Sequence, residues 1–191
     1  SSGSAAAVAD FMVPLAVGSQ TAGSLIRPAA YCGVHALKPT YGAVSFVGVK
    51  HLAASSDTLG MMARSIDDLG LFRSVLLGET GGGGVRAPSR APAIGFCRTP
   101  WWDEADAATR DALEASARSL SRAGARVADL ELSAEFNDLQ RDVWRIVHFE
   151  MARVLAPEYA ANAENLSTVT RDMIKAGRAV KHADYIHAMN A

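Results

Sequence analysis

The order of strand-like and helix-like segments in residues 93–132 limits the fold more than any other feature of the chain. The stretch AIGFCR indicates a strand, DAATRDALEASARSLSRAG indicates a helix that ends at Gly124, and ARVADLEL indicates a second strand. This order favours a parallel pair of strands, because parallel strands need a crossover connection, which is usually a helix. We therefore predict an α/β fold with a mixed sheet flanked by helices.

The other segments predict further elements around this unit. A linker is expected at the Gly/Pro-rich residues 80–92, within a single domain that spans residues 1–191, and the region between residues 41 and 64 is expected to be irregular. Because the chain starts and stops within helical patterns, we expect it to be an internal piece of a longer protein, incomplete at both ends. Strands are predicted at residues 14–18 and 33–40, and helices at residues 4–12, 65–79, 136–155, 169–180 and 183–189.

Composition excludes several classes of partner. The 191 residues include 19 Lys and Arg against 20 Asp and Glu, so the net charge of -1 gives no electrostatic case for nucleic acid or an anionic membrane. No apolar run approaches the roughly 20 residues of a membrane span. We expect a small-molecule partner, no nucleic acid and no membrane, and leave a homodimer open. Two cysteines are too few for a disulfide framework, so a cytoplasmic setting is expected.

The stretch VGSQTAGSLIRPAAYCG, residues 17–33, is unusually poor in bulky side chains. Such a run exposes backbone amides and a hydroxyl, which are the groups that acyl transfer needs. A serine becomes a nucleophile when a base takes its proton and donors await the charge on the substrate oxygen. Several N–H groups of residues 21–24 could serve one oxyanion. The other interpretation is a Gly/Ser turn that joins a strand to a helix.

Longer stretches favour the first interpretation. The segments SSGSAAAVA, PLAVGSQTAGSLIRPAAYCGVHALKPTYGAVS and ASSDTLGMMARSIDDLGLF together resemble the amidase signature family, serine hydrolases with a Ser, cis-Ser, Lys triad. The resemblance implies cleavage of an amide C–N bond through an acyl-enzyme on Ser24, with no metal or organic cofactor. It also implies an oxyanion hole formed by the backbone amides of Thr21, Ala22, Gly23 and Ser24.

The resemblance places the other triad members outside this chain. The cis-serine of the family falls at the position immediately before Ser1, and the lysine lies farther upstream. A shift of one residue would make Ser1 that serine, but Pro14, Leu15 and Gly18 fit the ungapped alignment. We expect Ser1 and Ser2 to lie beside the triad loop, either hydrogen-bonded within it or capping a helix. No lysine of the chain is assigned as the base, so the piece alone is expected to be inactive.

Two departures from the common family pattern point to a narrower substrate class. Gln20 stands where many members carry an acidic residue, and SLIRP has one residue more than the usual SIRxP. Both features resemble the malonamidase-type branch, in which an arginine three positions after the nucleophile meets a substrate carboxylate. This maps onto Arg27 and implies a small amide that bears a carboxylate. The alternative is a structural Arg27 that pairs with a buried acid.

Other functional classes stay open at this stage. The chain could belong to an amidotransferase subunit, could be a non-catalytic fragment, or could be an N-terminal nucleophile hydrolase that uses Ser1. A histidine-based serine hydrolase is disfavoured because the sequence has no GxSxG elbow. The HFE stretch at residues 148–150 lacks the PCxxC partner that a zinc deaminase requires.

Overall fold

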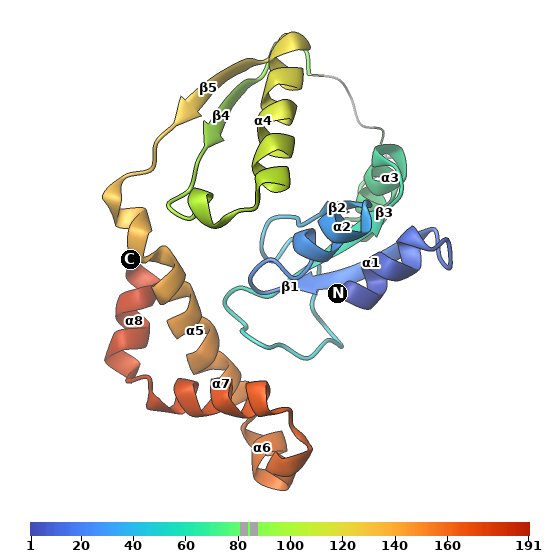
Figure 1. The fold of residues 1–191 in the computed structure, drawn as a ribbon. Coiled ribbons are helices and arrows are strands. Elements are labelled where there is room, and N and C mark those ends of the chain that lie inside the picture. Colours follow the sequence, from blue (N-terminus) through green and yellow to red (C-terminus); the bar gives the residue numbers. More distant parts are fainter. Residues whose placement is uncertain (81–83, 85–87) are drawn as a thin grey trace. The chain divides into compact units, whose positions relative to one another are not determined.

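The computed structural model describes residues 1–80, 84 and 88–191 of the chain, which divide into two compact units (Figure 1). The first unit consists of Ser1–Val85 together with Asp142–Ala191, and the second of Arg86–Arg141. Part of the predicted linker, residues 81–83 and 85–87, lies outside the described residues. Each unit is described by itself below.

An antiparallel sheet with the strand order β1-β3-β2 forms the centre of the first unit. Its strands are β1 (Leu15–Gln20), β2 (His35–Leu37) and β3 (Thr58–Ala63). The prediction that residues 41–64 are irregular is wrong over β3. Met61 and Met62 on this strand are both fully buried, so the strand is covered on both faces and lacks the polar alternation by which strands are recognised.

Helices cover both faces of this sheet. Helix α1 (Ser2–Ala9) and helix α2 (Ile26–Cys32) pack around Met62, whereas α3 (Ile66–Leu76) packs beside Met61 on the opposite face. Ser65 precedes α3 as its N-cap, and its hydroxyl accepts a hydrogen bond from the Asp68 amide at 3.1 Å. Helix α1 ends at Ala9, before the predicted residue 12.

The second unit confirms the predicted strand, helix and strand. Strands β4 (Ala93–Cys97) and β5 (Arg126–Leu130) pair in parallel, and α4 (Ala107–Arg122) connects them after a short 3-10 helix at Trp102–Glu104. The Asp106 carboxylate caps α4 by accepting a hydrogen bond from the Thr109 amide at 2.7 Å. This bond lowers the pKa of Asp106. The chain thus has the predicted α/β class, with one sheet antiparallel and the other parallel.

The C-terminal segment of the chain is helical. Met151 and Ala152 on α5 form a core with the fully buried Ile174 on α7, and Leu52 packs against this core. Helix α6 was not predicted from the sequence. Within the described residues, no helix combines the length and apolar character needed to cross a membrane. The helices are α5 (Leu139–Val154), α6 (Ala156–Asn162), α7 (Thr168–Ala179) and α8 (His182–Asn190), with 3-10 turns at Ala134–Asp138 and Ala163–Asn165.

Candidate active site

Leu25, the residue after Ser24, anchors the small-residue loop to the sheet. Its side chain is fully buried and lies over Gly18 of β1 and Gly60 of β3, which are register partners. A Cβ atom on Gly18 would lie 2.6 Å from Leu25 Cδ1, and one on Gly60 would collide with Leu25 Cδ2. Glycine at both positions therefore makes room for Leu25, which fixes the adjoining Ser24 above the sheet.

The side chain of Gln20 determines which backbone amides of the loop are already bonded. Its Oε1 atom accepts hydrogen bonds from the amides of Leu25 at 3.0 Å and Ile26 at 3.2 Å. These are the first amides of α2, which a helix leaves without an intrahelical partner. Gln20 thus satisfies the amides that follow Ser24 and none of those before Leu25.

The amides of Thr21, Ala22, Gly23 and Ser24 stay free to donate. Among residues 1–80, 84 and 88–191, no group accepts a hydrogen bond from any of these amides. Gly23 has a φ of 96°, a left-handed conformation that favours glycine, and its carbonyl accepts from the Arg27 amide at 3.0 Å. The loop can therefore offer N–H groups to an anionic oxygen, the chemistry predicted for it.

Ser24 opens onto a cavity of about 250 Å³ in the first unit. Ser24, Arg27, Pro28 and Tyr31 follow the spacing of one helix face, so a single surface of the segment lines this cavity. Sequence reasoning missed Pro28 and Tyr31, although their spacing from Ser24 could have identified both. The cavity is lined by Ser1, Ser2, Ser24, Arg27, Pro28 and Tyr31.

Ser1 lies beside this cavity and bonds to the backbone of β1. Its Oγ atom donates to the Ser19 carbonyl and accepts from the Ser19 amide, both at 2.9 Å. Ser1 occupies the N-cap position of α1, but these bonds direct its side chain toward the sheet and not toward the helix amides. Ser1 therefore makes no side-chain capping bond to α1, and its hydroxyl is bonded to strand β1. Ser2 contributes to the cavity wall.

Arg27 lines the cavity and is exposed. Within the part of the chain that the structure describes, no carboxylate lies within ion-pair distance of Arg27. The expectation of a structural pair with a buried acid therefore has no support here. An arginine without an acidic partner can hold a carboxylate through a bidentate contact.

Three of the lysines have partners away from Ser24. Lys38 Nζ donates to the Pro39 carbonyl at 2.9 Å, Lys50 pairs with Glu158, and Lys175 Nζ lies 3.4 Å from Asp172 Oδ1. The hydrogen bond from the Lys50 side chain lowers the pKa of Glu158.

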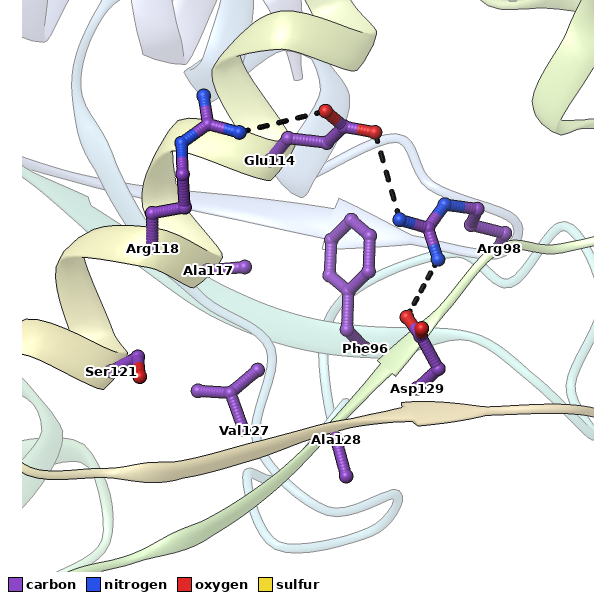
Figure 2. A pocket seen from close by; sticks show the side chains of 9 residues that line it. All are labelled: Phe96, Arg98, Glu114, Ala117, Arg118, Ser121, Val127, Ala128 and Asp129. Atoms are coloured by element: carbon purple, nitrogen blue, oxygen red, sulfur yellow. Dashed lines mark hydrogen bonds and ion pairs between the residues drawn. The ribbon is translucent and has the colours of Figure 1, made fainter.

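A second cavity, of about 280 Å³, lies between α4 and the β4–β5 pair (Figure 2). Its charged groups neutralise one another: Arg98 lies 2.6 Å from Asp129 and 3.6 Å from Glu114, which in turn lies 3.6 Å from Arg118. The hydrogen bond to Asp129 raises the pKa of Arg98. Because the charges of this cavity are already paired, it is a weaker candidate than the cavity beside Ser24.

Comparison with known proteins identifies relatives of the whole chain. A protein-family model described as Amidase matches residues 1–191. The chain also superposes on the crystal structure of an amidase with a TM-score of 0.87 and 28% identity, covering 98% of this chain and 42% of that one. A peptide amidase from Stenotrophomonas maltophilia superposes with a TM-score of 0.74 and 26% identity, covering 98% of this chain and 46% of that one.

Curated relatives match a shorter part of the chain at higher identity. A glutamyl-tRNA(Gln) amidotransferase subunit of Thermus thermophilus is 54% identical over 78 residues, which are 41% of this chain and 17% of that protein. The subunit of the same name from Staphylococcus carnosus is 44% identical over 88 residues, or 46% of this chain and 18% of that protein. The aligned part thus spans less than a fifth of either relative.

Proposed function

The chain belongs to the amidase family, and on this basis we propose that it carries the nucleophile loop of a serine amidohydrolase. One observation carries the proposal. The backbone amides of residues 21–24 have no acceptor among the described residues, and Ser24 of the same loop lines a cavity. The free amides and the hydroxyl lie on the same short loop, which is the arrangement that acyl transfer needs.

In the proposed reaction, Ser24 Oγ attacks the carbonyl carbon of an amide and loses its proton to a base. The carbonyl oxygen becomes an oxyanion, which accepts hydrogen bonds from the amides of residues 21–24. The C–N bond then breaks, and the nitrogen leaves as ammonia or an amine after it gains a proton. Water hydrolyses the acyl ester on Ser24, releases a carboxylic acid and restores the serine hydroxyl.

The base in this proposal is supplied from outside residues 1–191. The resemblance to the amidase signature family implies a lysine that takes the proton through a cis-serine. A lysine can act as a base near neutral pH only if its surroundings lower its pKa, and burial does so by disfavouring the ammonium form. We propose that the chain contributes Ser24 and the oxyanion hole, and that it lacks amidase activity when expressed alone.

The free guanidinium of Arg27 supports a substrate that bears a carboxylate, as in the malonamidase-type branch. Arg27 follows Ser24 by one helical turn and lines the same cavity. A carboxylate held there would sit a short distance from the amide carbonyl that Ser24 attacks, which favours a short dicarboxylic acid monoamide.

A second candidate function is that of one component of an amidotransferase. The observation that favours it is the 54% identity over 78 residues with the glutamyl-tRNA(Gln) amidotransferase subunit of Thermus thermophilus. The two functions differ in what the longer protein does alone. A free-standing amidase should hydrolyse a monoamide of a dicarboxylic acid without any partner, whereas an amidotransferase component should act only within its complex.

Labelling with an activated serine-directed phosphonate tests the proposal in the longer protein that contains this chain. We expect the adduct on Ser24, and we expect Ser24→Ala to abolish both labelling and acylation while the protein stays folded. Ser45→Ala, at an exposed hydroxyl on a loop, is the matched control and should label like the unaltered protein. Near-normal turnover by Ser24→Ala, or an adduct on another serine, would contradict the assignment.

We also propose a reducing, cytoplasmic setting for this enzyme. Cys32 and Cys97 are both free thiols and belong to different units of the structure. The ground for this proposal is the cysteine count, because two cysteines in 191 residues are too few for a disulfide framework.

A further inference from the structure

The antiparallel register of β1 and β3 brings Asp57 next to the proposed oxyanion loop. Gln20 and Thr58 are the last paired residues of these strands, so the next step of the ladder places Thr21 opposite Asp57. The Thr21 hydroxyl donates a hydrogen bond of 2.6 Å to Asp57 Oδ1. The first residue of the loop is therefore tied to a carboxylate that is 36 positions away in sequence.

Asp57 is itself held rigidly. The residue is only 5% exposed, and its other oxygen, Oδ2, accepts hydrogen bonds from the amides of Leu52 at 2.6 Å and Ala53 at 3.1 Å. The Asp57 amide donates back to the Ala53 carbonyl at 2.9 Å, which closes the turn. A buried carboxylate is costly unless donors satisfy it, and these donors fix both of its oxygens in place.

The surroundings of Asp57 link it to the rest of the first unit. His51 Nδ1 lies 3.3 Å from Asp57 Oδ2, and the His51 ring stacks on Phe46 at 4.2 Å. The amide of Ser55, in the same turn, donates to Glu150 on α5 at 2.9 Å. The carboxylate thus belongs to a framework that connects the loop to the helical core.

The two ends of the loop are held by different side chains. Gln20 fixes the amides of Leu25 and Ile26 after the loop, while Asp57 fixes the Thr21 side chain at its start. The amides between these two contacts keep a single orientation only if both the Gln20 bonds and the Asp57 bond are formed. We propose that Asp57 is a positioning residue that acts through Thr21 to orient the amides of residues 21–24 toward the oxyanion.

This inference rests on the proposed function, because it concerns the oxyanion hole of the same reaction. Asp57 does not line the cavity beside Ser24, and its contact with the loop is the hydrogen bond from Thr21. Loss of its contact should therefore lower stabilisation of the transition state more than binding of the substrate. We expect kcat to fall and KM to change little, since the oxyanion forms only after attack.

Turnover of the longer protein with and without the Thr21 hydroxyl tests the inference. Thr21→Val removes the donor but keeps the side-chain shape and the backbone amide, and we expect kcat to fall about 10- to 100-fold. Thr21→Ser restores a hydroxyl and should recover most of the activity. Thr58→Val is the matched control, because Thr58 is equally close to the turn but donates to the Ser56 carbonyl.

A double-mutant cycle assigns the effect to the pair. Asp57→Asn should lower kcat to a similar extent, and the Thr21→Val, Asp57→Asn double variant should lose no more than the worse single variant. If Asp57→Asn does not fold, the comparison of Thr21→Val with Thr21→Ser still decides the question.

The outcomes separate this inference from the proposed function. If Thr21→Val keeps the kcat of the Thr58→Val control while Ser24→Ala is inactive, the nucleophile assignment stands and the role of Asp57 is refuted. If Ser24→Ala keeps its turnover, the proposed function itself fails. A fall in kcat that Thr21→Ser does not restore would also count against a role for the hydroxyl contact.

Discussion

Gly18 and Gly60 face each other across the β1–β3 ladder, and the space that both leave is filled by the side chain of Leu25. The position of the proposed nucleophile thus depends on the absence of a Cβ atom at both glycines. Because Leu25 is fully buried, a shift of its side chain would be transmitted directly to Ser24.

We predict that Gly60→Ala destabilises the longer protein by about 1–3 kcal/mol, the usual cost of overpacking a core. The new Cβ atom would lie 2.5 Å from the Leu37 carbonyl oxygen and would collide with Leu25 Cδ2. Thermal unfolding measures the loss, and kcat should fall with it. Adding Leu25→Ala to Gly60→Ala should relieve part of the clash, so the two free-energy changes should not add. Strict additivity would show that Leu25 does not occupy this space.

We predict that replacing Arg27 affects substrates with and without a carboxylate differently. Arg27→Gln should lower kcat/KM for a dicarboxylic acid monoamide by about 10- to 100-fold, the amount expected for a charge-assisted contact of roughly 1.5–3 kcal/mol. The same variant should leave hydrolysis of a neutral aliphatic amide nearly unchanged. Arg27→Lys should recover only part of the loss, because lysine lacks the bidentate geometry. Equal losses for both substrates would assign Arg27 a structural role.

We predict that Gly177→Ala destabilises the contact between α5 and α7. A Cβ atom at this position would collide with the carbonyl of His148 and would lie 2.8 Å from the Ala152 Cβ atom. The unfolding free energy of the longer protein should fall by about 1–3 kcal/mol. Gly3→Ala is the matched control, because a Cβ atom on Gly3 in α1 meets nothing within 4 Å. That control should keep or slightly raise the stability, since alanine favours a helix.

We predict that His148 makes the protein less stable at acidic pH. Burial lowers the pKa of His148 below its ordinary value of 6.5, so the unfolded chain binds a proton more readily than the folded chain. Stability should therefore fall as the pH drops below 6.5 toward the folded-state pKa. His148→Gln should reduce the difference between the unfolding midpoints at about pH 7.5 and about pH 5.5.

The control for this prediction is His35→Gln, at an exposed position on β2. This variant should keep the pH dependence of the unaltered protein. If His148→Gln and His35→Gln show the same pH dependence as the unaltered protein, the half-buried imidazole of His148 is not responsible for any acid sensitivity.

Local sequence signals predicted the elements that depend on neighbouring residues. The Ser65 cap of α3 and the turn at Gly124 after α4 were both identified, because each depends on contacts within a few positions. Ser24 and Arg27 lie together at the cavity for the same reason, since they are one helical turn apart. Such spacing can be read without any knowledge of the fold.

The elements that were missed depend on pairing between distant segments. Strand β3 has no polar alternation because it is buried on both faces, and only its pairing with β1 and β2 identifies it. The contact between Thr21 and Asp57 follows from that pairing, so the sequence alone could not predict it. Gln20 departs from the common family pattern, but the sequence does not predict its bonds to Leu25 and Ile26, because these depend on how the loop turns in space.

The hydrogen bond between Ser55 and Glu150 has a consequence for the order of folding. It joins residues 95 positions apart, whereas the contact between Thr21 and Asp57 spans 36. Closing the longer loop costs more chain entropy, and Glu150 leaves the ribosome well after Asp57. During synthesis, the pair of strands β1 and β3, next to which Thr21 and Asp57 lie, can therefore assemble first, and the bond from Ser55 to Glu150 forms only when α5 has been made.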